Sequence, residues 1–255
     1  MSILESFKLE GKTAIVTGCT RGLGQGICEA LAEAGANIFG VGTSPQADET
    51  KHLVERTGRC FMYCSANLKS IKPIENIFTQ AVNKFNKINI VVNNAGTIRR
   101  NDALEFTEED WDDVINVNLK SLFFMCQAAA RQFYKQQTGG KIINIASMLS
   151  YQGGIRVPSY TASKSGVKGI TMSMANEWAK HGININAIAP GYMETENTAA
   201  LRADEQRNND ILNRIPAGRW GTPCDLKGAA VFLASSASDY VNGFTLAVDG
   251  GWLAR

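Results

Sequence analysis

The sequence predicts an α/β fold of the Rossmann type, a doubly wound parallel sheet of about seven strands with helices on both faces. Short β-rich apolar runs alternate with helical patterns along the 255-residue chain, as in successive βαβ units. The runs are nearly continuously apolar, which is typical of strands that are covered on both faces. No repeat, low-complexity tract or composition break interrupts this pattern. We therefore expect one domain over residues 1–255.

Each expected strand is a run of four to seven mainly apolar residues, and each helix has apolar residues at a spacing of three or four. The strands are expected at 13–17, 37–41, 60–65, 88–93, 141–145, 183–189 and 245–248. The helices are expected at 22–34, 48–57, 71–85, 111–136, 159–180 and 224–234.

The stretch 191–221 departs from this alternation because it is polar and irregular, with a helical section around 198–215. Long irregular segments that follow a strand are often functional. We expect a substrate loop there, with a solvated surface helix as the alternative.

The composition excludes several classes of partner. The net charge is only +2 and the basic residues are scattered, so no nucleic-acid footprint is expected. There is no uncharged apolar run of about 18 residues and no signal-peptide pattern at the start, so we expect a cytoplasmic protein without a membrane partner. The six cysteines are dispersed and are expected to be reduced and buried. His52 and His181 lack a second ligand at suitable spacing, so no metal is expected.

A glycine-rich turn, TGCTRGLG at residues 17–24, follows the first expected strand and leads directly into a helix. Its glycines allow a tight turn and a close backbone approach to a pyrophosphate. The N-terminus of the helix adds free N–H groups and the positive end of its dipole. The sequence therefore predicts a dinucleotide-binding turn.

The GxxxGxG spacing of this turn resembles that of the short-chain dehydrogenase/reductase family. The resemblance extends along essentially the whole chain, because the other family motifs follow in the expected order. They are the NNAG motif at 93–96, Asn118, Ser147, the YxxxK pair Tyr160 and Lys164, the Pro190-Gly191 turn, and Thr195.

Helix geometry supports a chemical role for Tyr160 and Lys164. Residues four apart share a helix face, and an ammonium near a phenol lowers the phenol's pKa from about 10. The resemblance implies that Tyr160 is the acid/base, that Ser147 binds the substrate oxygen, and that Lys164 also holds the nicotinamide ribose. It assigns to Asn118 a role in a water route for protons.

The resemblance also implies NAD(P) as the cofactor. The segment 41–44 carries no acid to bind the adenosine ribose, and Asn67 stands where relatives commonly have aspartate. Arg21 is suited to a 2′-phosphate, but no second basic residue supports it. We expect NAD, with NADP as the alternative. The cofactor-binding candidates are Gly18, Arg21, Gly22, Leu23, Gly24, Asn67, Leu68, Asn94, Ala95, Gly96, Tyr160, Lys164, Pro190, Gly191 and Thr195.

Arginines at two strand ends point to an anionic substrate. Arg100 follows the NNAG motif and Arg156 precedes Tyr160, and a guanidinium binds a carboxylate through paired hydrogen bonds. Exposed or interface arginines are the alternative. The substrate-binding candidates are Arg100, Ser147, Gln152, Arg156 and Tyr160.

These stretches and the C-terminal segment resemble a branch of the family that oxidises a secondary alcohol of deoxy sugar acids reversibly with NAD. Oxidation of gluconate, another NADP-linked carbonyl reduction, and a non-catalytic dinucleotide sensor remain open. The family usually assembles as tetramers through the helices expected at 111–136 and 159–180, so we expect a homotetramer. Its candidate interface residues are Phe123, Phe124, Met125, Met172 and Met174, with plain core as the alternative.

Overall fold

Seven parallel strands form one sheet in the order β3-β2-β1-β4-β5-β6-β7. The structure, a computed structural model, describes residues 2–255 apart from the side chain of Asn197. The predicted doubly wound sheet is confirmed, and every predicted strand is present within two residues of its expected ends. The strands are β1 (Thr13–Thr17), β2 (Asn37–Gly42), β3 (Phe61–Ser65), β4 (Ile90–Asn93), β5 (Gly140–Ile145), β6 (Ile183–Pro190) and β7 (Thr245–Val248).

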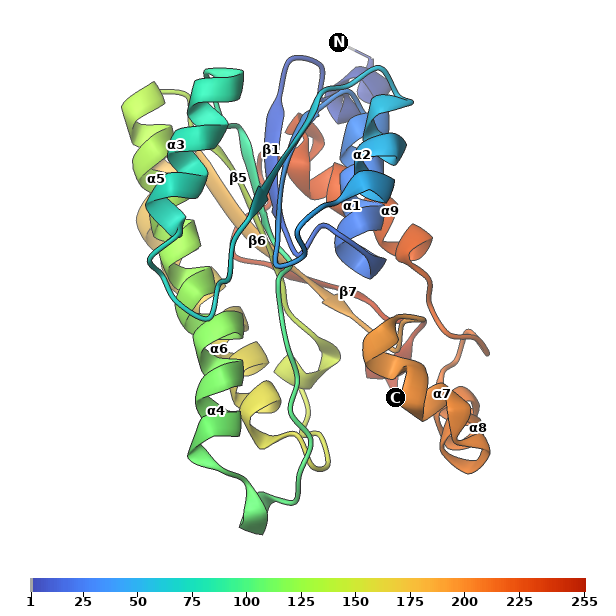
Figure 1. Cartoon of the computed structure of the whole chain (residues 1–255). Coiled ribbons are helices and arrows are strands. Elements are labelled where there is room, and N and C mark those ends of the chain that lie inside the picture. Colours follow the sequence, from blue (N-terminus) through green and yellow to red (C-terminus); the bar gives the residue numbers. More distant parts are fainter. Residues whose placement is uncertain (1) are drawn as a thin grey trace.

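Helices cover both faces of the sheet (Figure 1). One face packs against α1 (Gly22–Glu33), α2 (Asp48–Glu55) and α9 (Pro223–Ala234). The other packs against α3 (Ile74–Phe85), α5 (Leu122–Gln136) and α6 (Pro158–Trp178). All five side chains of β1 are buried. This double coverage is why the strands are continuously apolar.

The helix expected at 111–136 begins earlier and contains an irregular turn. It begins as α4 (Glu108–Ile115), because the Thr107 hydroxyl caps it by accepting a hydrogen bond from Asp110 N at 3.1 Å. A π-helical turn, η3 (Asn116–Ser121), then connects it to α5. Such turns occur often at functional sites and leave no signature in hydrophobic periodicity. Asn118 lies in this turn and is fully buried.

The helical section expected at 198–215 is divided into η6 (Glu196–Thr198), α7 (Ala199–Ala203) and α8 (Glu205–Arg214). The division falls at Asp204, whose backbone is extended. The Asp204 side chain caps α8 by accepting a hydrogen bond from Arg207 N at 3.0 Å. Ile211 of α8 is buried in a small cluster with Trp252 near the C-terminus. The segment is thereby anchored to the rest of the molecule.

The expectation that all six cysteines are buried is wrong at two positions, although all six are free. Cys60 is exposed because it lies just before the edge strand β3, and Cys224 is exposed in the first turn of α9. Among residues 2–255, no helix is long and apolar enough to cross a membrane.

Candidate functional site

The carboxyl ends of the central strands bring the predicted site residues to one edge of the sheet. Gly18 follows β1, Asn94 follows the neighbouring β4, Ser147 lies two residues beyond β5, and Gly191 follows β6. The chain order reverses between β1 and β4, and open α/β sheets bind ligands at such a switch point.

The glycine-rich turn has the shape that a pyrophosphate requires. Gly18 has a positive φ of 67°, and a Cβ on Gly24 would lie 2.1 Å from the Gly18 carbonyl oxygen. Asn94 Nδ2 donates to the carbonyl oxygens of Thr17 at 2.9 Å and Gly18 at 3.0 Å. Apart from its chain neighbours and the backbone of its own helix, a Cβ on Gly22 would contact, among residues 2–255, a methyl carbon of Thr195 at 3.7 Å. The turn is therefore rigid, and the N-terminus of α1 is open to an anion, so these residues fit a dinucleotide.

The end of β2, beside the glycine turn, carries no acidic residue over positions 41–44. A Cβ on Gly42 would lie 2.9 Å from the Thr20 methyl carbon, so the turn packs closely against this strand end. Asn67 Oδ1 accepts a hydrogen bond from Lys69 N at 2.9 Å, which fixes its own loop. The carbonyl of the buried Leu68 accepts from the Ser121 hydroxyl at 2.6 Å. Among the residues of the turn (17–24), the segment 41–44, Asn67 and Leu68, only Arg21 carries a charge.

Tyr160, Lys164 and Ser147 lie together as the family resemblance implies. Lys164 Nζ lies 5.5 Å from the centroid of the Tyr160 ring, and both residues belong to α6. The Lys164 ammonium donates to the carbonyl oxygen of Ile145 at 2.6 Å. Ser147 is hydrogen-bonded to Tyr160, and its Oγ also accepts from Leu149 N at 3.1 Å. The phenol therefore faces both a hydroxyl and a buried amine.

The pKa values of Tyr160 and Lys164 depend mainly on burial, whereas the helix spacing suggested an effect of the lysine charge on the phenol. Burial raises the pKa of Tyr160, and the Ser147 hydrogen bond and the charge of Arg100 lower it in part. Burial also lowers the pKa of Lys164 to about 8. The charge of Arg100 thus acts on the phenol and partly offsets the effect of burial on the pKa of Tyr160.

The side chain of Asn118 fixes the chain that follows β4. Its Oδ1 accepts from Thr97 N at 2.8 Å, and its Nδ2 donates to Thr97 O at 2.9 Å and to Ser163 Oγ at 3.2 Å. Because the amide is fully buried and uses both ends in this way, it ties the loop that carries Arg100 to α6.

The two candidate arginines have different surroundings. Arg156 Nε lies 3.2 Å from Asp102 Oδ1, and the Arg156 carbonyl accepts from Asn101 N at 3.1 Å. Arg156 also has a positive φ of 62°, which is uncommon for a residue with a side chain. The Gln152 side chain accepts from Arg214 at 3.3 Å. Arg156 thus ties two loops together, and only Arg100 has its charge directed at Tyr160.

Asp113 is a residue that the sequence reasoning missed. One of its oxygens lies 2.7 Å from Lys69 Nζ and the other 2.7 Å from Arg99 Nη2, and these cations hold the pKa of Asp113 below its ordinary value. It therefore joins the loop after β3 to the loop that carries Arg100. Asp110, one helical turn earlier, also faces Arg99, at 3.4 Å. The signal available in the sequence was the pair of acids Asp110 and Asp113, which lie three residues apart and so share one face of a helix.

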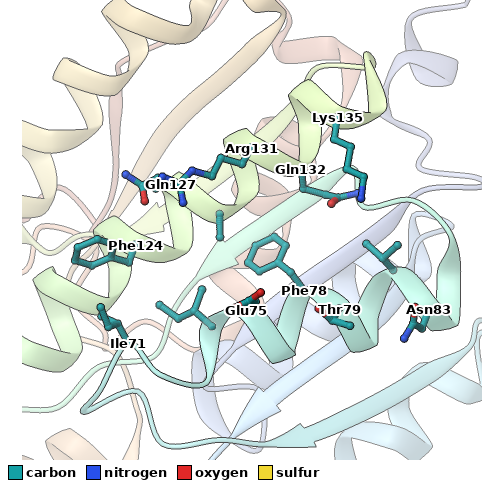
Figure 2. Close-up of a pocket in the computed structure, with 13 residues that line it drawn as sticks. Ile71, Glu75, Phe78, Thr79, Asn83, Phe124, Gln127, Arg131, Gln132 and Lys135 are labelled. Atoms are coloured by element: carbon teal, nitrogen blue, oxygen red, sulfur yellow. The ribbon is translucent and has the colours of Figure 1, made fainter.

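A separate groove of about 740 Å³ lies between α3 and α5 (Figure 2). Phe78 and Phe124 line it together with polar side chains such as Arg131, and it includes no predicted site residue. Within residues 2–255, no group of three His, Cys, Asp or Glu side chains is arranged to hold a metal ion.

Comparisons with known proteins agree with this geometry. The family profile described as enoyl-(acyl carrier protein) reductase matches residues 18–253. The 2-dehydro-3-deoxy-D-gluconate 5-dehydrogenase of Escherichia coli K12 is 65% identical over 99% of this chain and 100% of its own length.

Two solved structures add to the comparison. An Agrobacterium tumefaciens structure with bound NADP is 53% identical, covers 98% of this chain and 99% of its own, and has a TM-score of 0.90. The gluconate 5-dehydrogenase of Burkholderia cenocepacia, in complex with NADP and tartrate, is 37% identical with full coverage of both chains and a TM-score of 0.95.

The parallel sheet, the glycine turn and the Ser–Tyr–Lys group define a dinucleotide-dependent oxidoreductase that acts on CH–OH groups. This chain belongs to the short-chain dehydrogenase/reductase family. The cofactor class of the family, NAD(P), is that of the NADP-bound neighbours.

Proposed function

We propose that this protein moves a hydride reversibly between NAD(H) and a secondary alcohol or ketone of a deoxy sugar acid. The proposed activity is that of a 2-dehydro-3-deoxy-D-gluconate 5-dehydrogenase or 2-deoxy-D-gluconate 3-dehydrogenase. The observation that carries the proposal is the placement of Tyr160, between Ser147 and Arg100, at the edge that holds the glycine turn. The 65% identity with a full-length relative of the first activity supports the choice of substrate.

In the proposed mechanism Ser147 donates a hydrogen bond to the substrate oxygen, and Tyr160 Oη takes the hydroxyl proton during oxidation. A nicotinamide bound at this edge of the sheet would supply the hydride acceptor. Lys164 holds the nicotinamide ribose and receives the proton that Tyr160 has taken up. Asn118 orders the loop beside this proton route. Arg100 lowers the proton affinity of the phenol and attracts the substrate carboxylate.

The proposed cofactor contacts follow the family pattern. The backbone of Gly18, Gly22, Leu23 and Gly24 receives the pyrophosphate, Asn67, Leu68, Asn94, Ala95 and Gly96 surround the adenosine side, and Pro190, Gly191 and Thr195 hold the carboxamide end. The segment 191–221 is proposed to be a substrate loop, because Ile211 of α8 is buried in one cluster with Met148, the residue that follows Ser147.

The test of this proposal is oxidation of a panel of sugar acids, followed by absorbance of the reduced nicotinamide. We expect turnover of 2-deoxy-D-gluconate or of 2-dehydro-3-deoxy-D-gluconate, with gluconate much poorer. Preferential turnover of gluconate would select the gluconate dehydrogenase alternative. Cofactor binding without turnover of any sugar acid would instead indicate a non-catalytic sensor.

Replacing either arginine by alanine is expected to raise KM for the sugar acid more than it changes the Kd of NAD. The effect should be larger for Arg100→Ala, about tenfold or more, because a charge-assisted hydrogen bond contributes roughly 1.5–3 kcal/mol. Arg156→Ala should act through the loop that it ties to Asp102, so its effect should be smaller. Steady-state kinetics with separate cofactor titrations measure both. Unchanged KM values in both variants would contradict a carboxylate site at this place.

We further propose a homotetramer in the cytoplasm. Met125 and Met174 prove to be core residues, with 1% and 3% exposure, whereas Met172 is 45% exposed and Phe123 and Phe124 are partly buried. The side chains of α5 and α6 that remain exposed or partly buried, namely Phe123, Phe124 and Met172, support a subunit interface. The mass of the protein in solution would test this proposal. Six free thiols suit a reducing compartment.

A further inference from the structure

An ion pair joins the glycine turn to the segment that follows β6. Arg21 Nη1 lies 2.8 Å from Glu196 Oε2, and the two side chains are 72% and 67% exposed. Beside them, the Thr195 methyl carbon lies 3.7 Å from the Cβ position of Gly22. The ion pair therefore spans the gap between the N-terminus of α1 and the start of η6, the two sides of the proposed dinucleotide site.

The turn that carries Glu196 is fixed by hydrogen bonds of its own. The Thr198 hydroxyl donates to the Met193 carbonyl oxygen at 2.6 Å and accepts from Thr195 N at 3.2 Å. Arg202 Nη2 donates to the Thr195 carbonyl oxygen at 3.3 Å. These bonds fix the backbone on both sides of Glu196, and the Glu196 carboxylate extends from it to Arg21.

The end of β2 lacks the acidic residue that commonly distinguishes NAD from NADP. A carboxylate at the end of the second strand binds the ribose hydroxyls of NAD and repels the 2′-phosphate of NADP, whereas a nearby arginine accommodates that phosphate. Here the segment 41–44 reads VGTS, and Thr20, the residue before Arg21, packs against Gly42. A 2′-phosphate bound here would therefore meet both the positive charge of Arg21 and the negative charge of its partner Glu196.

We propose that Glu196 is a specificity-determining residue, because it engages Arg21 and disfavours NADP relative to NAD. The 2′-phosphate has to displace the Glu196 carboxylate from Arg21, whereas NAD leaves the ion pair intact. The inference rests on the proposed role of the turn in dinucleotide binding. Because both side chains are exposed, the exchange is possible and the discrimination is modest. Exposed pairs contribute up to about 1 kcal/mol, which corresponds to roughly fivefold in affinity.

The test is direct calorimetric titration of the unmodified protein and its variants with NAD and with NADP, without substrate. Glu196→Gln is expected to tighten NADP about three- to fivefold and to change NAD by less than about twofold. In the Arg21→Ala background, Glu196→Gln should have no effect on the NADP-to-NAD ratio. The matched control is Glu194→Gln, since that acid lies near Arg219 instead. The shift should shrink in about 1 M salt, where charges are screened beyond about 3 Å.

The outcomes distinguish the proposed role of Glu196 from the proposed binding of a dinucleotide by the glycine turn. An unchanged NADP-to-NAD ratio in Glu196→Gln, or an equal change in Glu194→Gln, would overturn the role of Glu196 while leaving dinucleotide binding in place. If neither dinucleotide binds the unmodified protein, the proposed function of the turn fails instead.

Discussion

Replacing Tyr160 by phenylalanine is expected to lower kcat for sugar-acid oxidation by about two to four orders of magnitude. The variant removes only the hydroxyl, so it deletes the proton acceptor and the hydrogen bond with Ser147 while keeping the packing of the ring. The ring lies on α6 beside Lys164, and neither the glycine turn nor its Asn94 support is altered. The Kd of NAD should therefore stay close to that of the unmodified protein.

Two measurements separate this result from a folding defect. Calorimetric titration gives the Kd of NAD, and thermal unfolding gives Tm with and without NAD. Tyr151→Phe is a matched control, because its hydroxyl bonds the Thr245 carbonyl at 3.1 Å outside the proposed proton route. If Tyr160→Phe retained kcat within about tenfold, the assignment of Tyr160 as the acid/base would be wrong.

Replacing Lys164 by methionine should have the second largest effect, about a hundredfold loss of kcat/KM, and it should also change how stability depends on pH. Lys164 is 4% exposed, and burial lowers its pKa from 10.5 to about 8. In the unfolded chain the lysine keeps its ordinary pKa. Between pH 8 and 10.5 the unfolded state therefore binds more protons, so the free energy of unfolding rises with pH.

The methionine variant lacks this titration. The stability of the unmodified protein relative to Lys164→Met should increase by about 3 kcal/mol from pH 8 to 10.5, which is the free energy that corresponds to the difference between the two pKa values. Urea unfolding of the cofactor-free proteins at several pH values measures it. Lys180→Met, at an exposed position just after α6, controls for loss of a lysine charge. A stability difference that does not vary with pH would contradict the burial of a titrating amine.

Local pattern predicted most of the fold because it reports local geometry. The continuous apolar runs located all seven strands, and the glycine spacing located the turn whose Gly24 cannot carry a Cβ. The same pattern predicted the end of the helix at 136 correctly, but it placed the start at 111 instead of Glu108 and missed the π turn. Hydrophobic spacing is insensitive to one extra residue in a turn and to a capping hydroxyl such as that of Thr107.

The amino-acid sequence by itself determined the parallel sheet, the order of the motifs and the i, i+4 placement of Tyr160 and Lys164. Only the tertiary structure decided which charges meet. It paired Arg156 with Asp102 and Arg21 with Glu196, and it directed the charge of Arg100 at Tyr160. Such partners lie tens or hundreds of residues apart in the chain. Their meeting depends on how the strand ends and loops pack, and burial then sets the pKa of a group such as Lys164.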